Sequence, residues 1–183
     1  MKLIIGLTGT MNSGKGTVAE LIESHGFEHF ILSKIIKEET ASQHLTVTRE
    51  NLQDMGDKLR KEHGLGALAK LAFERSKTDK VLIDGIRNPG EIDFLKEHGR
   101  FFLVAVDAPI ELRYQRAQER KSEKDSVSFE QFIHDDERDL GINQPGNGQQ
   151  VQACIDCADA IINNISREES EARVRELLVS LLH

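Results

Sequence analysis

The chain has 183 residues, of which 38% are hydrophobic and 30% charged, and its net charge is −7. This length and balance predict one domain, 1–183, with a full core. The negative charge argues against a broad nucleic-acid or anionic-membrane surface. No apolar run approaches the roughly 20 residues that span a bilayer, and residues 3–7 are too short for a secretory signal. We therefore expect a cytoplasmic monomer or homodimer whose partners are small molecules, not nucleic acids or membranes.

A glycine-rich loop lies near the N-terminus between an apolar run and a segment with helical spacing. Its sequence, Gly9-Thr10-Met11-Asn12-Ser13-Gly14-Lys15-Gly16-Thr17, matches G-x-x-x-x-G-K in the strand–loop–helix context of a phosphate-binding loop. The glycines let backbone N–H groups converge on one hollow, which the positive end of the helix also faces. The loop predicts binding of a nucleoside triphosphate, with contacts from Gly9, Met11, Asn12, Ser13, Gly14, Lys15, Gly16 and Thr17.

Two positions of this loop carry specific chemistry. Lys15 supplies a mobile cation for the outer phosphates. Gly16 follows it, so the Ser or Thr that commonly binds magnesium directly after the lysine is missing, and the hydroxyl comes one place later, at Thr17. This departure favours a small-molecule kinase over GTPase or motor-type switches. It leaves Thr17 as a weak candidate for the metal.

Apolar runs alternate with helical patterns along the chain. Candidate strands are residues 2–8, 27–32, 80–84, 101–107 and 158–163, and a final helix is expected over 167–182. This order predicts an α/β fold with three layers, α/β/α, around a five-stranded parallel sheet. Ligands of such sheets bind beyond the carboxyl ends of the strands. The residues that follow each strand are therefore the candidate site.

The third expected strand ends in Asp84 and is followed closely by Arg87. A carboxylate at that position can hold magnesium directly or through water. The guanidinium of Arg87 can clamp a phosphate with two hydrogen bonds. Taken alone, Asp84 is equally compatible with a helix cap or a turn. Together with the phosphate loop, the pair indicates a metal-linked carboxylate and a phosphate-binding arginine.

A helix that follows the fourth expected strand carries Arg113, Arg116 and Arg120 on one face. These arginines favour an anionic ligand, although a solvated face paired with Glu111, Glu119 and Glu123 is the alternative. The hydrophilic stretch at about 120–128 is typical of a short lid that closes over a triphosphate. An acidic helix with Arg138 comes after it.

Residues 33–66 form the expected acceptor-binding insertion. Thr46 or Thr48 is expected to cap a helix with a buried stripe of Leu52, Met55 and Leu59. A second face of that helix carries Arg49, Gln53 and Arg60, which suit a base edge and a phosphate, or form a polar outer face. Ser33 and Lys34, which follow the second strand, and Asp84 and Arg87, at the end of the third, join them as candidates for acceptor binding.

Two cysteines, Cys154 and Cys157, form a lone C-x-x-C pair. A zinc site needs further cysteines or histidines at matching spacing, and none lies nearby in the sequence. We interpret them as two small residues one helical turn apart, with a redox role as the weaker alternative. No histidine receives a role.

The chain resembles nucleotide kinases of the phosphate-loop superfamily over its whole length. It is most similar to an adenylate-kinase-related and dephospho-CoA-kinase-related family, and its middle also resembles phage-type deoxynucleoside monophosphate kinases. The segments that carry the resemblance are residues 9–17, Thr48-Arg49-Glu50-Asn51-Leu52-Gln53 through Gly56 and Leu59-Arg60, Ile83-Asp84-Gly85-Ile86-Arg87-Asn88-Pro89-Gly90-Glu91, Asp135-Asp136-Glu137-Arg138 and Ala158-Asp159-Ala160-Ile161-Ile162-Asn163-Asn164.

The resemblance implies ATP and Mg²⁺ as cofactors and transfer to a nucleoside or deoxynucleoside monophosphate. It implies that Lys15 stabilises the transferring phosphoryl group and that Arg87 holds the acceptor phosphate. Arg116 and Arg120 would contact the donor nucleotide, Arg138 would lie on the far side of the lid, and Asn164 would lie near the donor adenine. Two alternatives stay open: transfer to a ribose hydroxyl, as in dephospho-CoA kinase, and a regulatory module that hydrolyses ATP slowly.

Overall fold

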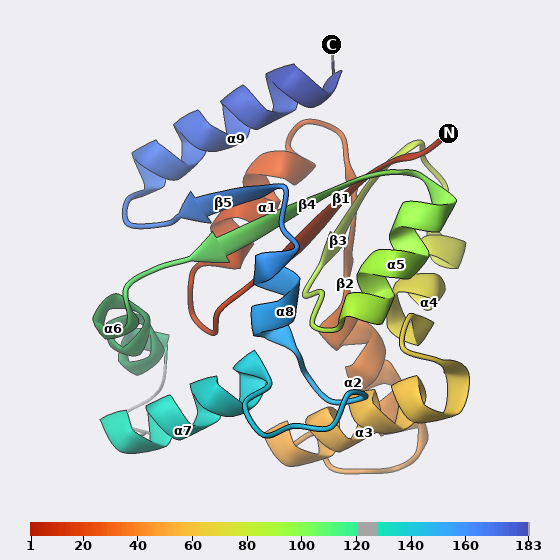
Figure 1. Ribbon diagram of the computed structural model, residues 1–183, viewed down its shortest axis with the longest axis vertical. Helices are drawn as coiled ribbons and strands as arrows, with labels where there is room; N and C mark the ends of the chain where they lie inside the picture. Colours follow the sequence, from red (N-terminus) through yellow and green to blue (C-terminus); the bar gives the residue numbers. More distant parts are fainter. Residues whose placement is uncertain (121–127, 183) are drawn as a thin grey trace.

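The computed structural model describes residues 1–120 and 128–182, apart from the side chains of Arg49 and Arg120. Its centre is a parallel sheet in the order β2-β3-β1-β4-β5 (Figure 1). The strands are β1 (Leu3–Gly9), β2 (Glu28–Ile31), β3 (Lys80–Asp84), β4 (Arg100–Asp107) and β5 (Ala160–Asn163). The five expected strands and the three-layer α/β class are therefore confirmed, with ends that move by one or two residues.

Helices cover both faces of this sheet, as Figure 1 shows. On one face lie α1 (Lys15–Glu23) and α9 (Arg167–Leu182). On the other lie α2 (Leu32–Ser42), α3 (Arg49–His63), α4 (Ala67–Arg75), α5 (Pro89–His98) and α8 (Val151–Asp156). Beyond the carboxyl end of β4, α6 (Ile110–Arg120) and α7 (Phe129–Leu140) flank the part of the chain that the structure leaves out.

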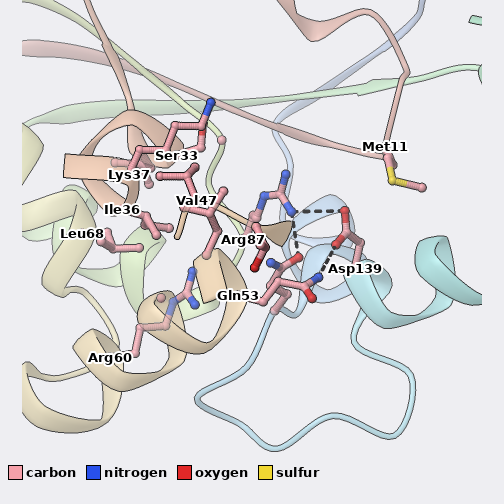
Figure 2. Close-up of a pocket in the computed structure, with 16 residues that line it drawn as sticks. Met11, Ser33, Ile36, Lys37, Val47, Gln53, Arg60, Leu68, Arg87 and Asp139 are labelled. Atoms are coloured by element: carbon pink, nitrogen blue, oxygen red, sulfur yellow. Dashed lines mark hydrogen bonds and ion pairs between the residues drawn. The ribbon is translucent and has the colours of Figure 1, made fainter. Parts of the chain in front are cut away.

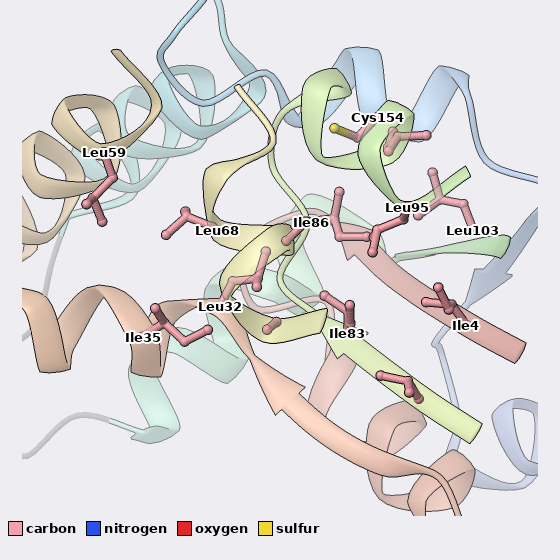
Figure 3. Close-up of a cluster of buried hydrophobic side chains, with 14 of the residues drawn as sticks. Ile4, Leu32, Ile35, Leu59, Leu68, Ile83, Ile86, Leu95, Leu103 and Cys154 are labelled. Atoms are coloured by element: carbon pink, nitrogen blue, oxygen red, sulfur yellow. The ribbon is translucent and has the colours of Figure 1, made fainter. Parts of the chain in front are cut away.

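The core divides according to the alternation of side chains along the strands. Ile4 points into the cluster beneath α2 to α5, which Figure 3 shows with Leu32, Leu68 and Cys154. Its neighbour Ile5 points into the cluster beneath α1 and α9. Because successive strand residues face opposite sides, a strand buried on both faces must be apolar throughout. This explains why runs of apolar residues in the sequence predict the strands.

The insertion at 33–66 consists of α2 and α3 and leads into α4. Thr48 caps α3, since its hydroxyl accepts a hydrogen bond of 3.2 Å from the backbone N–H of Asn51. Of the expected stripe, Met55 and Leu59 are buried in the core, whereas Leu52 lines a cavity. α2 and α3 therefore form one wall of that cavity.

The remaining expectations on fold concern the cysteines and the membrane. Cys154 is buried, Cys157 is exposed, and both are free. Burial raises the pKa of the Cys154 thiol, which makes it a poor nucleophile and supports the packing interpretation. Among the described residues, no helix is long and apolar enough to cross a bilayer.

Candidate functional site

The phosphate loop has the backbone shape that its glycines predict. Gly9 and Gly14 have positive φ values of 135° and 85°. A Cβ at Gly9 would overlap the carbonyl oxygen of Val106, and one at Gly14 would overlap the side-chain amide of Asn164. A Cβ at Gly16 would meet nothing within 4 Å. Gly9 and Gly14 are therefore required by the fold, whereas the missing hydroxyl at Gly16 has no steric cause.

Side chains from distant elements fasten this loop. Thr10 donates a hydrogen bond of 2.6 Å to Asp107 at the end of β4. Asn164 donates to the carbonyl oxygen of Ser13 at 2.8 Å, and Arg116 donates to the same oxygen at 3.0 Å and to the Asn164 carbonyl at 2.8 Å. Asn164 and Arg116, both expected near the donor nucleotide, thus reach the loop and brace it. The buried Ser13 hydroxyl has no hydrogen-bond partner among the described residues.

Lys15 occupies the hollow of the loop. Its Nζ donates hydrogen bonds of 2.8 Å to the carbonyl oxygens of Gly9 and Thr10. Burial, together with the positive charge of Arg87, lowers the pKa of Lys15 to about 8, although Asp84 and Asp139 oppose the shift. An ammonium in this setting gains most when an anion replaces the water that it has lost.

Arg113 neither faces an open ligand site nor lies on a solvated surface, the two alternatives predicted from the sequence. Its guanidinium is buried and forms a two-pronged ion pair with Asp136 of α7, at 2.6 and 2.9 Å. Its Nε and Nη1 also donate to the carbonyl oxygens of Ala108 and Met11. Arg113 therefore ties α7 to the phosphate loop and is neither a solvated surface residue nor an open phosphate ligand.

A cavity of about 450 Å³ lies beside the loop, between the carboxyl edge of the sheet and helices α2, α3 and α7 (Figure 2). Of the expected acceptor residues it brings together Ser33, Gln53, Arg60 and Arg87. Lys37 lines the cavity, whereas Lys34, one turn earlier on α2, is exposed outside it. Arg49 begins α3, and its side chain falls outside the described residues. The remaining wall is largely apolar and comprises Met11, Leu32, Ile36, Val47, Leu52 and Leu68.

Arg87 is the central cation of this cavity. Its Nη1 donates hydrogen bonds of 3.1 Å to Asp139 and 2.7 Å to Gln149. Gln53 reaches the other oxygen of Asp139 at 3.4 Å. Asp139 and Gln149 were not singled out from the sequence, because only the three-dimensional fold brings α7 and the loop 141–150 to the end of β3.

Arg60 is held by Glu91, a buried carboxylate on α5 to which no role was predicted from the sequence. Both Nε and Nη2 of Arg60 lie 3.1 Å from one oxygen of Glu91. The other oxygen accepts hydrogen bonds from the backbone N–H groups of Arg87 and Asn88. The signal was present, since Asn88-Pro89-Gly90-Glu91 spells a capping box that begins α5. Arg60 thus supports the turn that carries Arg87.

Comparison with known proteins identifies the families to which the chain belongs. A model of the AAA domain (AAA_18) matches residues 5–140. A UPF0200 protein of Methanoregula boonei is 36% identical over 97% of both chains. The chain belongs to the AAA domain family and to the UPF0200 family. Among solved structures, TT1252 from Thermus thermophilus is similar over 100% of this chain and 98% of its own, with 21% identity and a TM-score of 0.64. Shikimate kinase from Bacteroides thetaiotaomicron is similar over 99% of both chains, with 18% identity and a TM-score of 0.59.

These likenesses show that the UPF0200 chain has a P-loop, kinase-like fold. The loop fits a polyphosphate by its own geometry, since Gly9 and Gly14 adopt the positive φ values that its curled backbone needs and α1 begins at Lys15. For a magnesium ion, the structure offers Asp84, opposite Leu7 at the carboxyl edge. Its oxygen lies 3.7 Å from Nε2 of His29. Burial opposes the charged form of His29, but Asp84 and Glu23 outweigh it and raise its pKa.

The other expected residues of the lid region lie apart from the cavity or outside the described residues. Arg138, on α7, places Nη2 3.9 Å from Asp54 of α3 and does not line the cavity. The side chain of Arg120 and residues 121–127 fall outside the described residues. The lid at about 120–128 therefore stays a prediction, as do the roles of Arg120 and Arg138.

The pKa of Lys15 predicts how ATP affinity depends on pH. A bound triphosphate favours the charged form of Lys15, so above pH 8 binding must also take up a proton. We expect the affinity for ATP to fall as the pH rises above 8, by at most about tenfold per unit. Calorimetry at pH 8.5 in two buffers of different ionisation enthalpy measures the proton uptake. Uptake that persists in Lys15→Met would contradict the assignment.

Proposed function

We propose that the protein is an ATP-dependent kinase that phosphorylates a nucleoside or deoxynucleoside monophosphate to the diphosphate. The position of Arg87 carries this proposal, because its guanidinium lines the cavity and its charge acts on Lys15 in the phosphate loop. Donor loop and cavity are therefore neighbours, as transfer between two bound phosphates requires. The cavity volume of about 450 Å³ lies within the range of small-molecule sites.

The side chains suit a reaction that works by positioning and charge. Lys15 would neutralise the transferring group and Arg87 the acceptor phosphate. A monophosphate oxygen is already anionic and needs no general base. Among the described residues that line the cavity, Asp139 is the one that carries a carboxylate, and it is hydrogen-bonded to Arg87. This supports a phosphate acceptor over a hydroxyl acceptor, whose proton a free carboxylate would accept.

The remaining residues have supporting roles in this proposal. Ser33 and Gln53 would contact the acceptor from α2 and α3, beside the apolar wall. A bound magnesium ion neutralises phosphate charge. Asp84 would hold this ion through water, and Thr17 is the second candidate for holding it. The hollow between Gly9 and Gly14 would take the phosphate tail of ATP. The enzyme would act on soluble nucleotides of the cytoplasm.

An acceptor panel tests the proposal. Ribo- and deoxyribonucleoside monophosphates, dephospho-CoA and shikimate are each incubated with ATP, magnesium and the protein, while ADP release and product mass are followed. We expect diphosphates from one or more monophosphates. Product from dephospho-CoA alone would indicate transfer to a ribose hydroxyl, and product from shikimate alone would indicate a kinase for another small hydroxyl acceptor. A rate of ADP release that no added acceptor changes would indicate a regulatory module that hydrolyses ATP slowly.

Replacement of Arg87 tests the residue that carries the proposal. We expect Arg87→Ala to lower kcat/KM for the acceptor by roughly 10- to 100-fold, because a charge-assisted contact with the acceptor phosphate is lost. KM for ATP should change by less than about twofold. Arg75→Ala removes an exposed arginine that pairs with Glu38 and serves as the control. Equal acceptor kinetics in Arg87→Ala and the wild type would refute this role.

A further inference from the structure

The guanidinium of Arg87 is held from one side only. Its Nη1 donates to Asp139, as a dashed line in Figure 2 shows, and also to Gln149. Among the residues that the structure describes, its Nε and Nη2 donate no hydrogen bond, and the side chain is 31% exposed. These two nitrogen atoms form the edge with which Arg60 grips Glu91 in this same protein. Arg87 therefore presents an open two-pronged edge at the cavity.

The two groups that hold Arg87 are themselves fixed. Asp139 is buried one turn after Asp136, whose ion pair with Arg113 fastens α7 to the phosphate loop. Gln149 lies next to Gln150, whose backbone N–H donates to the carbonyl oxygen of Arg87 at 2.7 Å.

The loop 141–150 has a second anchor at the same turn. The side-chain amide of Asn88 donates to the carbonyl oxygens of Gly146 and Gly148 at 2.8 and 3.0 Å. Asp139 and Gln149 therefore belong to two anchored segments, α7 and the loop 141–150. Together they fix the direction of the Arg87 guanidinium before any ligand binds.

We propose that Asp139 and Gln149 are positioning residues that aim the Nε and Nη2 edge of Arg87 at the acceptor phosphate. This inference rests on the proposed function, because it takes Arg87 as the acceptor's anchor. An arginine fixed in this way loses little rotamer entropy when a phosphate binds, and its planar edge selects a group with two oxygen atoms at the right spacing. Monophosphate acceptors meet that requirement.

A competing arrangement makes the opposite prediction. If Asp139 were a counter-ion that the phosphate must displace, its removal would free Arg87 and tighten acceptor binding. If Asp139 aims Arg87 and stays in place, its removal loosens the guanidinium and weakens acceptor binding. The sign of the effect of Asp139→Asn therefore separates the two.

The experiment compares Asp139→Asn, Gln149→Ala and the control Glu137→Gln, which removes one negative charge from an exposed position of the same helix. Calorimetry without ATP measures binding of the monophosphate that the wild type phosphorylates best and of inorganic phosphate. Steady-state kinetics then give KM for the acceptor and for ATP. We expect Asp139→Asn to lower acceptor kcat/KM roughly 10- to 100-fold with KM for ATP unchanged. Gln149→Ala should act in the same direction, and Glu137→Gln should match the wild type.

A double-mutant cycle shows whether the effect passes through Arg87. In the Arg87→Ala background, Asp139→Asn should change acceptor binding by less than about twofold. Tighter binding in Asp139→Asn, or a loss that persists without Arg87, would overturn the inference.

The failure of the proposed function has a different signature. In that case the wild type forms no diphosphate from any monophosphate. Phosphate binding that depends on Arg87 and weakens in Asp139→Asn would then still support the positioning role. Phosphate binding that Asp139→Asn leaves unchanged would refute it.

Discussion

Lys15→Met is expected to lower kcat for phosphoryl transfer by roughly 10²- to 10³-fold or more, because one preorganised charge at the transferring group is lost. The methionine keeps the length of the side chain and removes the ammonium. The hollow of the loop has no second lysine among its described residues, so nothing nearby replaces the charge. Initial rates at saturating ATP and acceptor measure the effect. A variant that retains more than about a tenth of the wild-type kcat would contradict the role of Lys15.

Stability separates loss of chemistry from loss of fold. Burial holds the pKa of Lys15 at about 8 in the folded protein, against 10.5 ordinarily, so folding disfavours its charged form. Below pH 8 both states carry the proton and the penalty is fully present. It disappears between pH 8 and 10.5, where the unfolded chain binds more protons. Lys15→Met should therefore melt at pH 7 no lower than the wild type. Lys70→Met, at an exposed position of α4, is the matched control.

The sequence was sufficient for the sheet and for the phosphate loop because both are local in sequence. Strands buried on both faces read as apolar runs, and Gly9 to Lys15 combine backbone freedom with a charge in one stretch. The prediction that Arg87 lies at the carboxyl edge also succeeded, since it follows a strand end. These features need no knowledge of which distant segments meet.

The partners of the arginines could not be read in the same way. Helical spacing placed Arg113 and Arg116 on one face but could not show that Asp136 and the loop carbonyl of Ser13 would meet them there. Asp139 and Gln149 reach Arg87 only through the fold, across 52 and 62 positions of sequence. Charge pairing at such separations depends on topology, and spacing along one helix carries no information about it.

Glu91→Ala is expected to lower the free energy of unfolding by about 3–5 kcal/mol, the largest stability effect that we predict. The Glu91 side chain is 0% exposed, and that of Arg60 is 2% exposed. Loss of the carboxylate leaves the buried guanidinium of Arg60 with only the partly exposed Asp57, 3.5 Å from its Nη1, as a counter-ion among the described residues. It also leaves two backbone N–H groups, of Arg87 and Asn88, without this acceptor. Chemical denaturation measures the change. Glu97→Ala, on an exposed part of the same helix, should alter stability by less than about 0.5 kcal/mol.

The double variant Arg60→Met with Glu91→Gln tests whether the uncompensated charge causes this loss. Glutamine still offers an oxygen to the N–H groups of Arg87 and Asn88, and methionine removes the buried cation, so we expect this variant to be more stable than Glu91→Ala. Because the turn that carries Arg87 is then retained, acceptor binding should also survive better than in Glu91→Ala. A double variant as unstable as Glu91→Ala would mean that packing around Glu91, and not its charge, holds the turn in place.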